Sequence, residues 1–295
     1  MITGQLKRVI ELQSVQSNSK KNRNNICAVV SGKGGTGKTV FSIYLSDFLA
    51  KKGNKILLID LDINLANIHF LLNEAPEKSL NSYFKHNDEL KNVISEYSDN
   101  LHIIYGLNAY SFKDISFASA LNKLLQDILF VSEHYDLVIL DLGAGLSEFL
   151  LNVLKNSGIK IIVSFPEPTS IMDAYAVIKM YENFDTASEF NLVLNRCMDK
   201  AEGIDSFNKL AKAVQSFLKS SVKLLTTISD SKEIKHLIVE QKLLARCDSE
   251  EQFMSEFAVA ADKIDKYIHL TNINQPHRTS SFGTAKINSK SSFNL

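Results

Sequence analysis

The sequence has few cysteines, and they lie far apart. Cys27, Cys197 and Cys247 form no C-x-x-C pair. A sparse, odd set of this kind fits a reducing compartment and argues against a disulfide framework. It also argues against an iron–sulfur carrier, whose cysteine ligands lie close in sequence or meet across a dimer. We therefore predict that the three cysteines are small core residues of a cytoplasmic protein.

The sequence also has no long hydrophobic run and no excess of charge of one sign. Apolar runs stay below the length of about 18 residues that a membrane-spanning helix needs, and the first residues lack the apolar segment of a signal peptide. The 33 basic and 33 acidic side chains leave a formal net charge of zero. Any contact with nucleic acid or a membrane surface therefore has to be local.

Hydrophobic patterning divides the 295 residues into three parts. Residues 1–25 predict a short amphipathic helix followed by a polar, basic linker. Residues 26–270 alternate strand and helix patterns and predict one large domain. Residues 271–295 are rich in Asn and Ser and contain no acid, so we expect a disordered, mildly basic tail.

The middle part predicts an α/β fold with a mostly parallel, doubly wound sheet and helices on both faces, because strand and helix patterns alternate along it. The expected strands are 26–31, 55–60, 101–105, 136–141, 159–165, 190–195 and 222–228. The expected helices are 40–52, 114–134, 146–156, 170–184, 205–219, 231–240 and 250–269.

A phosphate-binding loop is predicted at residues 31–39, which read SGKGGTGKT. The pattern G-x-x-x-x-G-K-[ST] of P-loop NTPases is satisfied from Gly32 to Thr39. A buried-strand pattern precedes the loop and a helix pattern follows it, so the phosphates would meet a helix N-terminus. Lys38 should reach the β- and γ-phosphates, and the Thr39 hydroxyl should bind Mg²⁺. The residues expected to bind the nucleotide here are Gly34, Gly35, Thr36, Gly37, Lys38 and Thr39.

Acidic residues stand where two predicted strands end. Asp60 and Asp62 follow the run KILLI, and Asp141 ends the run YDLVIL, with Gly143 and Gly145 behind it. Ligands of open α/β sheets lie beyond the carboxyl ends of the strands, so these residues should face the phosphate loop. We predict that Asp141 is the acid at Mg²⁺, that Asp62 positions the attacking water, and that the Gly145 N–H senses the γ-phosphate. A helix cap or a turn is the alternative role of each aspartate.

Lys33 is a second lysine in the loop. KGGTGKT at 33–39 resembles the deviant Walker A motif of the MinD/ParA class of ATPases, and DLDINLAN and DLGAG resemble its switch I and switch II. The resemblance implies a catalytic Lys33 that reaches the ATP of a partner subunit, so that ATP drives homodimer formation. Another cation at the triphosphate stabilises charge only when two subunits meet. A solvated loop lysine is the alternative.

Further stretches narrow the resemblance. FPEPTSIMDAYAVIKM at 165–180 resembles a segment of the FlhG family (also written FleN or YlxH), MinD-like ATPases that control flagellar number and placement in bacteria. LVLNRC at 192–197 resembles the segment whose asparagine, here Asn195, hydrogen-bonds adenine; an amide offers both a donor and an acceptor, and a strand-end turn is the alternative. The resemblance covers residues 26–269 and implies slow hydrolysis of Mg-ATP to ADP and phosphate.

The resemblance also implies partners. They are a second copy of the chain, the SRP-type GTPase FlhF, flagellar switch or basal-body proteins, and the inner face of the cell membrane as a peripheral contact. In this class a terminal amphipathic helix often inserts into the membrane, but the pattern at Gln252–Leu270 is flanked by acids and predicts core packing. The N-terminal segment lacks a clear D-Q-A-x-x-L-R motif, which argues against activation of FlhF by this chain.

Three residues depart from the family pattern. Asn64 stands where switch I usually has glycine, Leu142 replaces a hydroxyl residue after Asp141, and Ile228 replaces a proline. These changes bear on the hydrolysis rate more than on binding, so a nucleotide binder without hydrolysis stays an alternative. The runner-up function is that of a ParA-like partition ATPase that binds DNA non-specifically through phosphate contacts, against which the neutral net charge argues.

Overall fold

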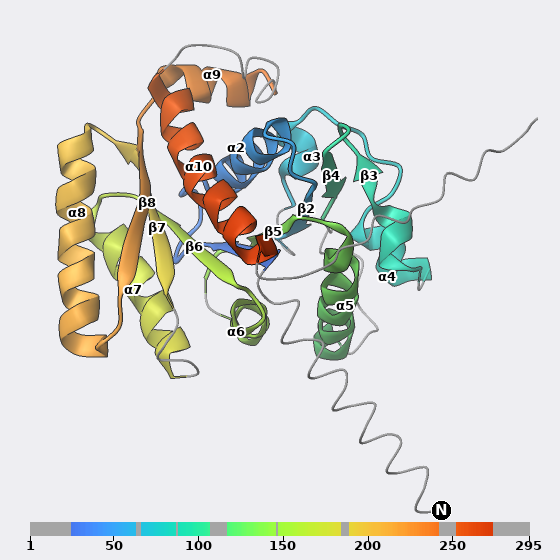
Figure 1. Cartoon of the computed structure of the whole chain (residues 1–295), viewed down its shortest axis with the longest axis horizontal. Helices are drawn as coiled ribbons and strands as arrows, with labels where there is room; N and C mark the ends of the chain where they lie inside the picture. Colours follow the sequence, from blue (N-terminus) through green and yellow to red (C-terminus); the bar gives the residue numbers. More distant parts are fainter. Residues whose placement is uncertain are drawn as a thin grey trace, which may run out of the picture.

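The computed structural model describes residues 25–62, 66–86, 88–106, 117–145, 147–183, 189–241 and 252–273. These residues form one eight-stranded sheet with helices on both faces (Figure 1). The strand order is β3-β4-β2-β5-β1-β6-β7-β8. All neighbouring pairs are parallel except β3 with β4. The predicted doubly wound α/β fold is therefore confirmed.

The strands are mostly continuous apolar runs, as expected of strands that are covered on both faces. They are β1 (Ile26–Val30), β2 (Ile56–Leu61), β3 (Ser95–Glu96), β4 (Leu101–Ile104), β5 (Leu137–Leu142), β6 (Ile159–Ser164), β7 (Phe190–Cys197) and β8 (Val222–Ser229). All seven predicted strands are present. The sequence missed β3, because two residues are too short to show an alternating pattern.

Most helices lie between successive strands, and α9 and α10 follow the last strand. They are α2 (Lys38–Lys51), α3 (Ile68–Leu71), α4 (Leu80–His86), α5 (Phe117–Val131), α6 (Glu148–Lys155), α7 (Pro168–Glu182), α8 (Lys200–Ala213), α9 (Lys232–Val239) and α10 (Gln252–Ile273), with the short turns η2 (Leu90–Val93), η4 (Ser132–His134) and η5 (Val214–Leu218). The sequence missed α3, α4 and η2, each of seven residues or fewer. It also placed the start of α8 too late, because the Asp199 side chain caps that helix by accepting the Glu202 N–H.

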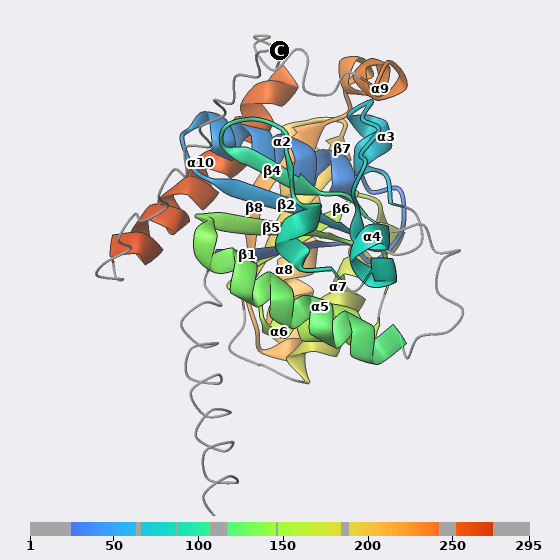
Figure 2. The ribbon, with the colours of Figure 1, turned by 90° about the vertical axis from the view of Figure 1, so that its right-hand side faces the viewer.

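Two apolar cores lie on opposite faces of the sheet. Successive side chains of a strand point to opposite faces, so each strand contributes residues to both cores. In β1, Ala28 and Val30 enter one core, and Cys27 and Val29 enter the other. Figure 2 shows α5 and α6 on one side of the sheet and α2 and α10 on the other. The apolar side of α10, with Phe257 among its residues, is buried in the second core, which confirms the predicted core packing of this helix.

Several predictions concern residues outside those described. They are the N-terminal helix and linker up to residue 24, the tail from residue 274 on, Asn64 and Cys247, and they stay predictions. The predicted start of the tail at residue 271 is three residues too early, because α10 continues to Ile273. Within the described part, Cys27 and Cys197 are buried as expected, and burial raises the pKa of both thiols, to about 12 for Cys197. Among the described helices, none combines the length and the apolar character that crossing a bilayer requires.

Candidate functional site

The predicted phosphate loop joins β1 to α2 at the carboxyl edge of the sheet. Gly35 and Gly37 have φ angles of 78° and 86°, a region in which glycine is far less strained than other residues. A Cβ atom on Gly34 or Gly35 would meet nothing within 4 Å, so open space lies beside this part of the backbone. Gly37 ends the loop as the N-cap residue of α2, where helix N–H groups are available to an anion. The local geometry is that of an anion cradle.

Asn195, from the carboxyl end of β7, holds the loop from the side. Its Nδ2 donates to the backbone oxygen of Thr36 at 2.8 Å, and its Oδ1 accepts the N–H of Arg196 at 2.9 Å. A Cβ atom on Gly37 would lie 2.2 Å from that Nδ2, so only glycine leaves room for the contact. Asn195 therefore lies beside the phosphate loop and positions it through the bond to Thr36. Its contact with adenine stays a prediction.

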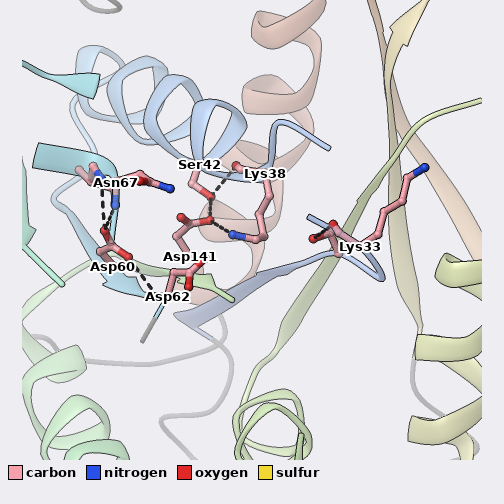
Figure 3. Close-up of polar contacts among 9 residues, drawn as sticks. Lys33, Lys38, Ser42, Asp60, Asp62, Asn67 and Asp141 are labelled. Carbon is pink, nitrogen blue, oxygen red and sulfur yellow. Dashed lines mark hydrogen bonds and ion pairs between the residues drawn. The ribbon is translucent and has the colours of Figure 1, made fainter. Parts of the chain in front are cut away.

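Lys38 and Asp141 form a buried ion pair beneath the loop (Figure 3). Nζ of Lys38 lies 3.1 Å from Oδ1 of Asp141, and the two side chains are 7% and 0% exposed. The Ser42 hydroxyl donates to the same carboxylate oxygen at 3.1 Å. The other oxygen, Oδ2, is buried and has no hydrogen-bond partner among the described residues. The acid predicted at Mg²⁺ is thus in place and has acceptor capacity left.

The sequence did not single out Ser42. Ser42 lies one helical turn after Lys38 on α2, so both side chains reach the same point. Its hydroxyl contacts the Lys38 backbone oxygen as well as Asp141, both at 3.1 Å. The i, i+4 spacing from the loop lysine was the signal that would have identified it.

Asp60 is a second buried acid, opposite Asp141 in the β2–β5 register. Its carboxylate accepts the backbone N–H groups of Asp62, Asn67 and Ile68 at 3.1, 3.0 and 3.2 Å (Figure 3). Burial and the negative charge of Asp141 raise its pKa to about 7, although the N–H donors and Lys38 act in the opposite direction. Asp60 therefore anchors both ends of the segment 62–68, a role that the sequence left unassigned.

Asp62, the residue predicted to position water, lies just beyond β2 and is half-buried. A Cβ atom on Gly143 would lie 3.3 Å from its Oδ1, so the two predicted switch segments meet here. The N–H of Gly145 donates to the backbone oxygen of Ser31 at 3.2 Å, which joins the second switch to the phosphate loop. Leu142, the last residue of β5, directly precedes Gly143, and its apolar side chain is buried. The proposed contacts of Asp62 and Gly145 with water and phosphate stay predictions.

Lys33 points away from the Lys38–Asp141 pair (Figure 3). Its Nζ lies 3.4 Å from Oε2 of Glu167, and the two side chains are 33% and 63% exposed. The same Nζ lies 5.6 Å from the centre of the Phe165 ring, and the Arg196 guanidinium lies 5.1 Å from that centre. The two loop lysines thus occupy different environments, one buried against an acid and one near the surface. The roles of Glu167 and Arg196 as neighbours of Lys33 were missed by the sequence.

A cavity of about 50 Å³ opens beside the helix end of the loop. Its lining includes Gly37, Val40 and Asn195, together with Ser229 and Phe257. A second, more polar cavity of about 420 Å³ shares Arg196 and Asp230 with it.

The residues present fit Mg²⁺ and a nucleoside triphosphate. The glycine cradle leaves space for phosphate, and Lys38 lies beside it. Two buried oxygens, Oγ1 of Thr36 and Oδ2 of Asp141, lack hydrogen-bond partners among the described residues. Buried polar atoms without partners are uncommon in folded proteins, and here both lie where the nucleotide and its metal would supply one. Thr39, half-buried at the second position of α2, would place its hydroxyl at the metal.

Comparison with known proteins gives consistent matches. A family model described as an AAA domain matches residues 24–195. The chain is similar to the antiactivator FleN of Pseudomonas aeruginosa, with 27% identity over 82% of this chain and 86% of FleN. It is also similar to the flagellum site-determining protein YlxH of Helicobacter pylori, with 31% identity over 77% of this chain and 76% of YlxH. Among solved structures, the septum site-determining protein MinD of Pyrococcus horikoshii, complexed with Mg-ADP, matches with a TM-score of 0.67 and 23% identity over 84% of this chain and 98% of that one.

Proposed function

The chain belongs to the MinD/ParA class of P-loop ATPases, and from this premise we propose that it is an ATP-driven dimerising switch that controls the number or placement of flagella. The flagellar part of the proposal rests on YlxH, whose name assigns it to the siting of the flagellum, and on the resemblance of residues 165–180 to the FlhG family, to which the name FleN also belongs. The site geometry supports the nucleotide part. ATP with Mg²⁺ would be the ligand, and the products of hydrolysis would be ADP and phosphate.

Each site residue has a proposed part in this cycle. The N–H groups of Gly34–Thr39 bind the phosphates, and Lys38 neutralises their charge. Thr39 and Asp141 hold Mg²⁺, which supplies charge neutralisation at the phosphates when bound. Asp62 orients the attacking water, and the Gly145 N–H senses the γ-phosphate. The base would enter the cavity beside Gly37, and Asn195, which lines that cavity, would hydrogen-bond the adenine edge.

The observation that supports an ATP-dependent dimer is the position of the Lys33 side chain, near the surface of the subunit. It is partly exposed and held by Glu167, away from the Lys38–Asp141 pair of its own subunit. A cation placed there can meet the triphosphate of a second copy without leaving a buried partner unpaired. Two subunits would thus complete each other's sites, and hydrolysis would release them.

The test is the molecular mass in solution, measured by light scattering after size exclusion, with and without Mg-ATP. Asp62→Ala should bind ATP, hydrolyse it slowly and stay dimeric. Lys33→Ala should bind ATP and stay monomeric, while Lys209→Ala, which changes an exposed lysine paired with Asp205 on α8, should behave as the unmodified chain. A monomeric Asp62→Ala variant at saturating Mg-ATP would refute the dimer switch.

The physiological partners belong to the same proposal and rest on the family resemblance. They are the GTPase FlhF, flagellar switch or basal-body proteins, and a peripheral membrane contact of a cytoplasmic protein. The ParA-like alternative is tested separately by filter binding to DNA with ATP at two salt concentrations, because binding through phosphate contacts falls steeply with salt. Salt-sensitive DNA retention that requires ATP would favour that alternative.

A further inference from the structure

We propose that Glu256 on α10 is a positioning residue for nucleotide binding, because it clamps the turn that forms one wall of the base cavity. The inference rests on the proposed function, since the cavity is assigned to the base of the nucleotide. The turn comprises Ser229, Asp230 and Ser231 between β8 and α9, and all three line the cavity beside Gly37.

The clamp consists of two short hydrogen bonds to one residue. Oε2 of Glu256 accepts the backbone N–H of Ser229 at 2.7 Å, and Oε1 accepts the Ser229 hydroxyl at 2.6 Å. The backbone oxygen of Glu256 also accepts the Thr226 hydroxyl at 2.9 Å. Hydrogen bonds to a carboxylate are about twice as strong as those between neutral groups. Glu256 therefore fixes both the backbone and the side chain of the first residue of the turn.

The rest of the turn is held by other elements. Nζ of Lys235 lies 2.7 Å from the Asp230 carboxylate, and the Ser231 hydroxyl donates to Oε2 of Glu233 at 2.8 Å. Residues 222–241 contain no proline that would fix a backbone angle. The Asp230 N–H donates to the Cys197 oxygen at 2.9 Å, and the Ser231 hydroxyl caps α9 by accepting the Ile234 N–H at 3.2 Å. These bonds hold the turn to β7 and to α9, whereas Glu256 ties it to α10. Without Glu256, the Ser229 end of the turn loses its charged partner.

The neighbouring residue places the clamp at the cavity. Phe257 lines the cavity and packs against Tyr44 of α2, with ring centres 4.6 Å apart. Figure 1 shows α10 lying along β8 and α2, which contribute Ser229 and Val40 to the cavity lining. One turn of α10 therefore supplies both Phe257, an apolar residue of the cavity lining, and the carboxylate that fixes Ser229 in the same lining. A shift of that turn would change the cavity and leave the glycine cradle intact.

This separation makes the test specific. Mg-ATP and inorganic tripolyphosphate with Mg²⁺ share the cradle, but only ATP has a base. By isothermal titration, Glu256→Ala should raise the Kd of Mg-ATP about tenfold, the equivalent of about 1.4 kcal/mol, and leave that of tripolyphosphate unchanged. Glu256→Gln should restore ATP affinity to within about twofold, because its amide can accept the Ser229 N–H and donate to the Ser229 hydroxyl.

Lys263→Ala is the matched control. Lys263 also lies on α10 and also ties it to β8, through Nζ bonds to the oxygens of Leu224 and Leu225 at 3.1 and 2.6 Å, but it does not line the cavity. This variant should lower the unfolding temperature without changing the ratio of the two Kd values. Equal loss of ATP and tripolyphosphate binding in Glu256→Ala, unchanged ATP binding, or a Lys263→Ala variant with the same selective loss would overturn the inference. An unmodified chain that binds no Mg-ATP would instead refute the proposed function.

Discussion

Replacing Gly37 by alanine should destabilise the chain through two separable effects. The residue has a φ of 86°, and an alanine held there costs about 1–2 kcal/mol. The added Cβ would also lie 2.2 Å from Nδ2 of Asn195, so the amide must move and its bond to the Thr36 oxygen is lost. Such a bond contributes about 0.5–1.5 kcal/mol. We expect Gly37→Ala to lower the free energy of unfolding by about 1.5–3.5 kcal/mol.

Alanine variants of two neighbouring glycines separate the backbone strain from the steric conflict. The free energy of unfolding of each variant is measured by urea denaturation at constant pH. Gly35 has a φ of 78° but open space at its Cβ position, so Gly35→Ala should cost the strain alone, about 1–2 kcal/mol. Gly34 has open space and no positive φ, so Gly34→Ala should change stability by less than about 0.5 kcal/mol. Gly34→Ala should therefore be the most stable of the three variants, Gly35→Ala the next, and Gly37→Ala the least stable.

A double-mutant cycle isolates the contact with Asn195. In an Asn195→Ala background the steric conflict is absent, so Gly37→Ala should cost no more than Gly35→Ala does in the unmodified chain. The coupling between the two positions should be about 0.5–1.5 kcal/mol. A Gly37→Ala variant as stable as Gly35→Ala, or a coupling near zero, would show that Asn195 does not hold the loop.

Three further predictions concern the buried charges. Because the folded chain holds the Asp60 proton more tightly than the unfolded chain, stability should fall as pH rises from about 4 to about 7; Asp60→Asn should flatten this slope in urea titrations at pH 5 and pH 8, and an unchanged slope would contradict it. Lys38→Met leaves Asp141 buried without its cation and should cost about 3–5 kcal/mol at pH 8 by the same measurement. The cost should be smaller at pH 5, where Asp60 holds a proton and no longer places a second negative charge beside Asp141, and an equal cost at both values would contradict this. Ser42→Ala should cost about 1.5–3 kcal/mol, because its hydroxyl donates to the Asp141 carboxylate; Ser46→Ala, which loses only a bond to the Ser42 backbone oxygen, is the milder control, and thermal unfolding of both checks the order.

The sequence predicted the parts of the fold that depend on local patterns. Continuous apolar runs identified β1 and β5 because parallel strands are buried on both faces. The glycine and lysine spacing identified the phosphate loop because its chemistry is local. Elements of a few residues, such as β3 and α3, were missed because they are held by neighbours instead of by their own periodicity.

The contacts that hold the site were beyond sequence reasoning. Asn195 is 159 residues from Thr36, and Glu256 is 27 residues from Ser229. Neither pair follows a helical or strand spacing, so only the folded chain brings them together. Asp60 was noted as a strand-end acid, but its three backbone donors come from a loop whose path no pattern specifies.

The two loop lysines differ in the free energy that is lost when each leaves its ion pair. This difference decides which of them can contact the nucleotide of a second subunit. Moving Lys38 would leave a carboxylate with 0% exposure unpaired, at a cost of about 3–5 kcal/mol. Lys33 would lose an ion pair to a Glu167 side chain that is 63% exposed, and such surface pairs contribute about 0–1 kcal/mol. Even a weak attraction to a partner's triphosphate exceeds that cost. In the proposed dimer cycle, Lys33 is therefore the loop lysine whose displacement toward a second subunit costs less.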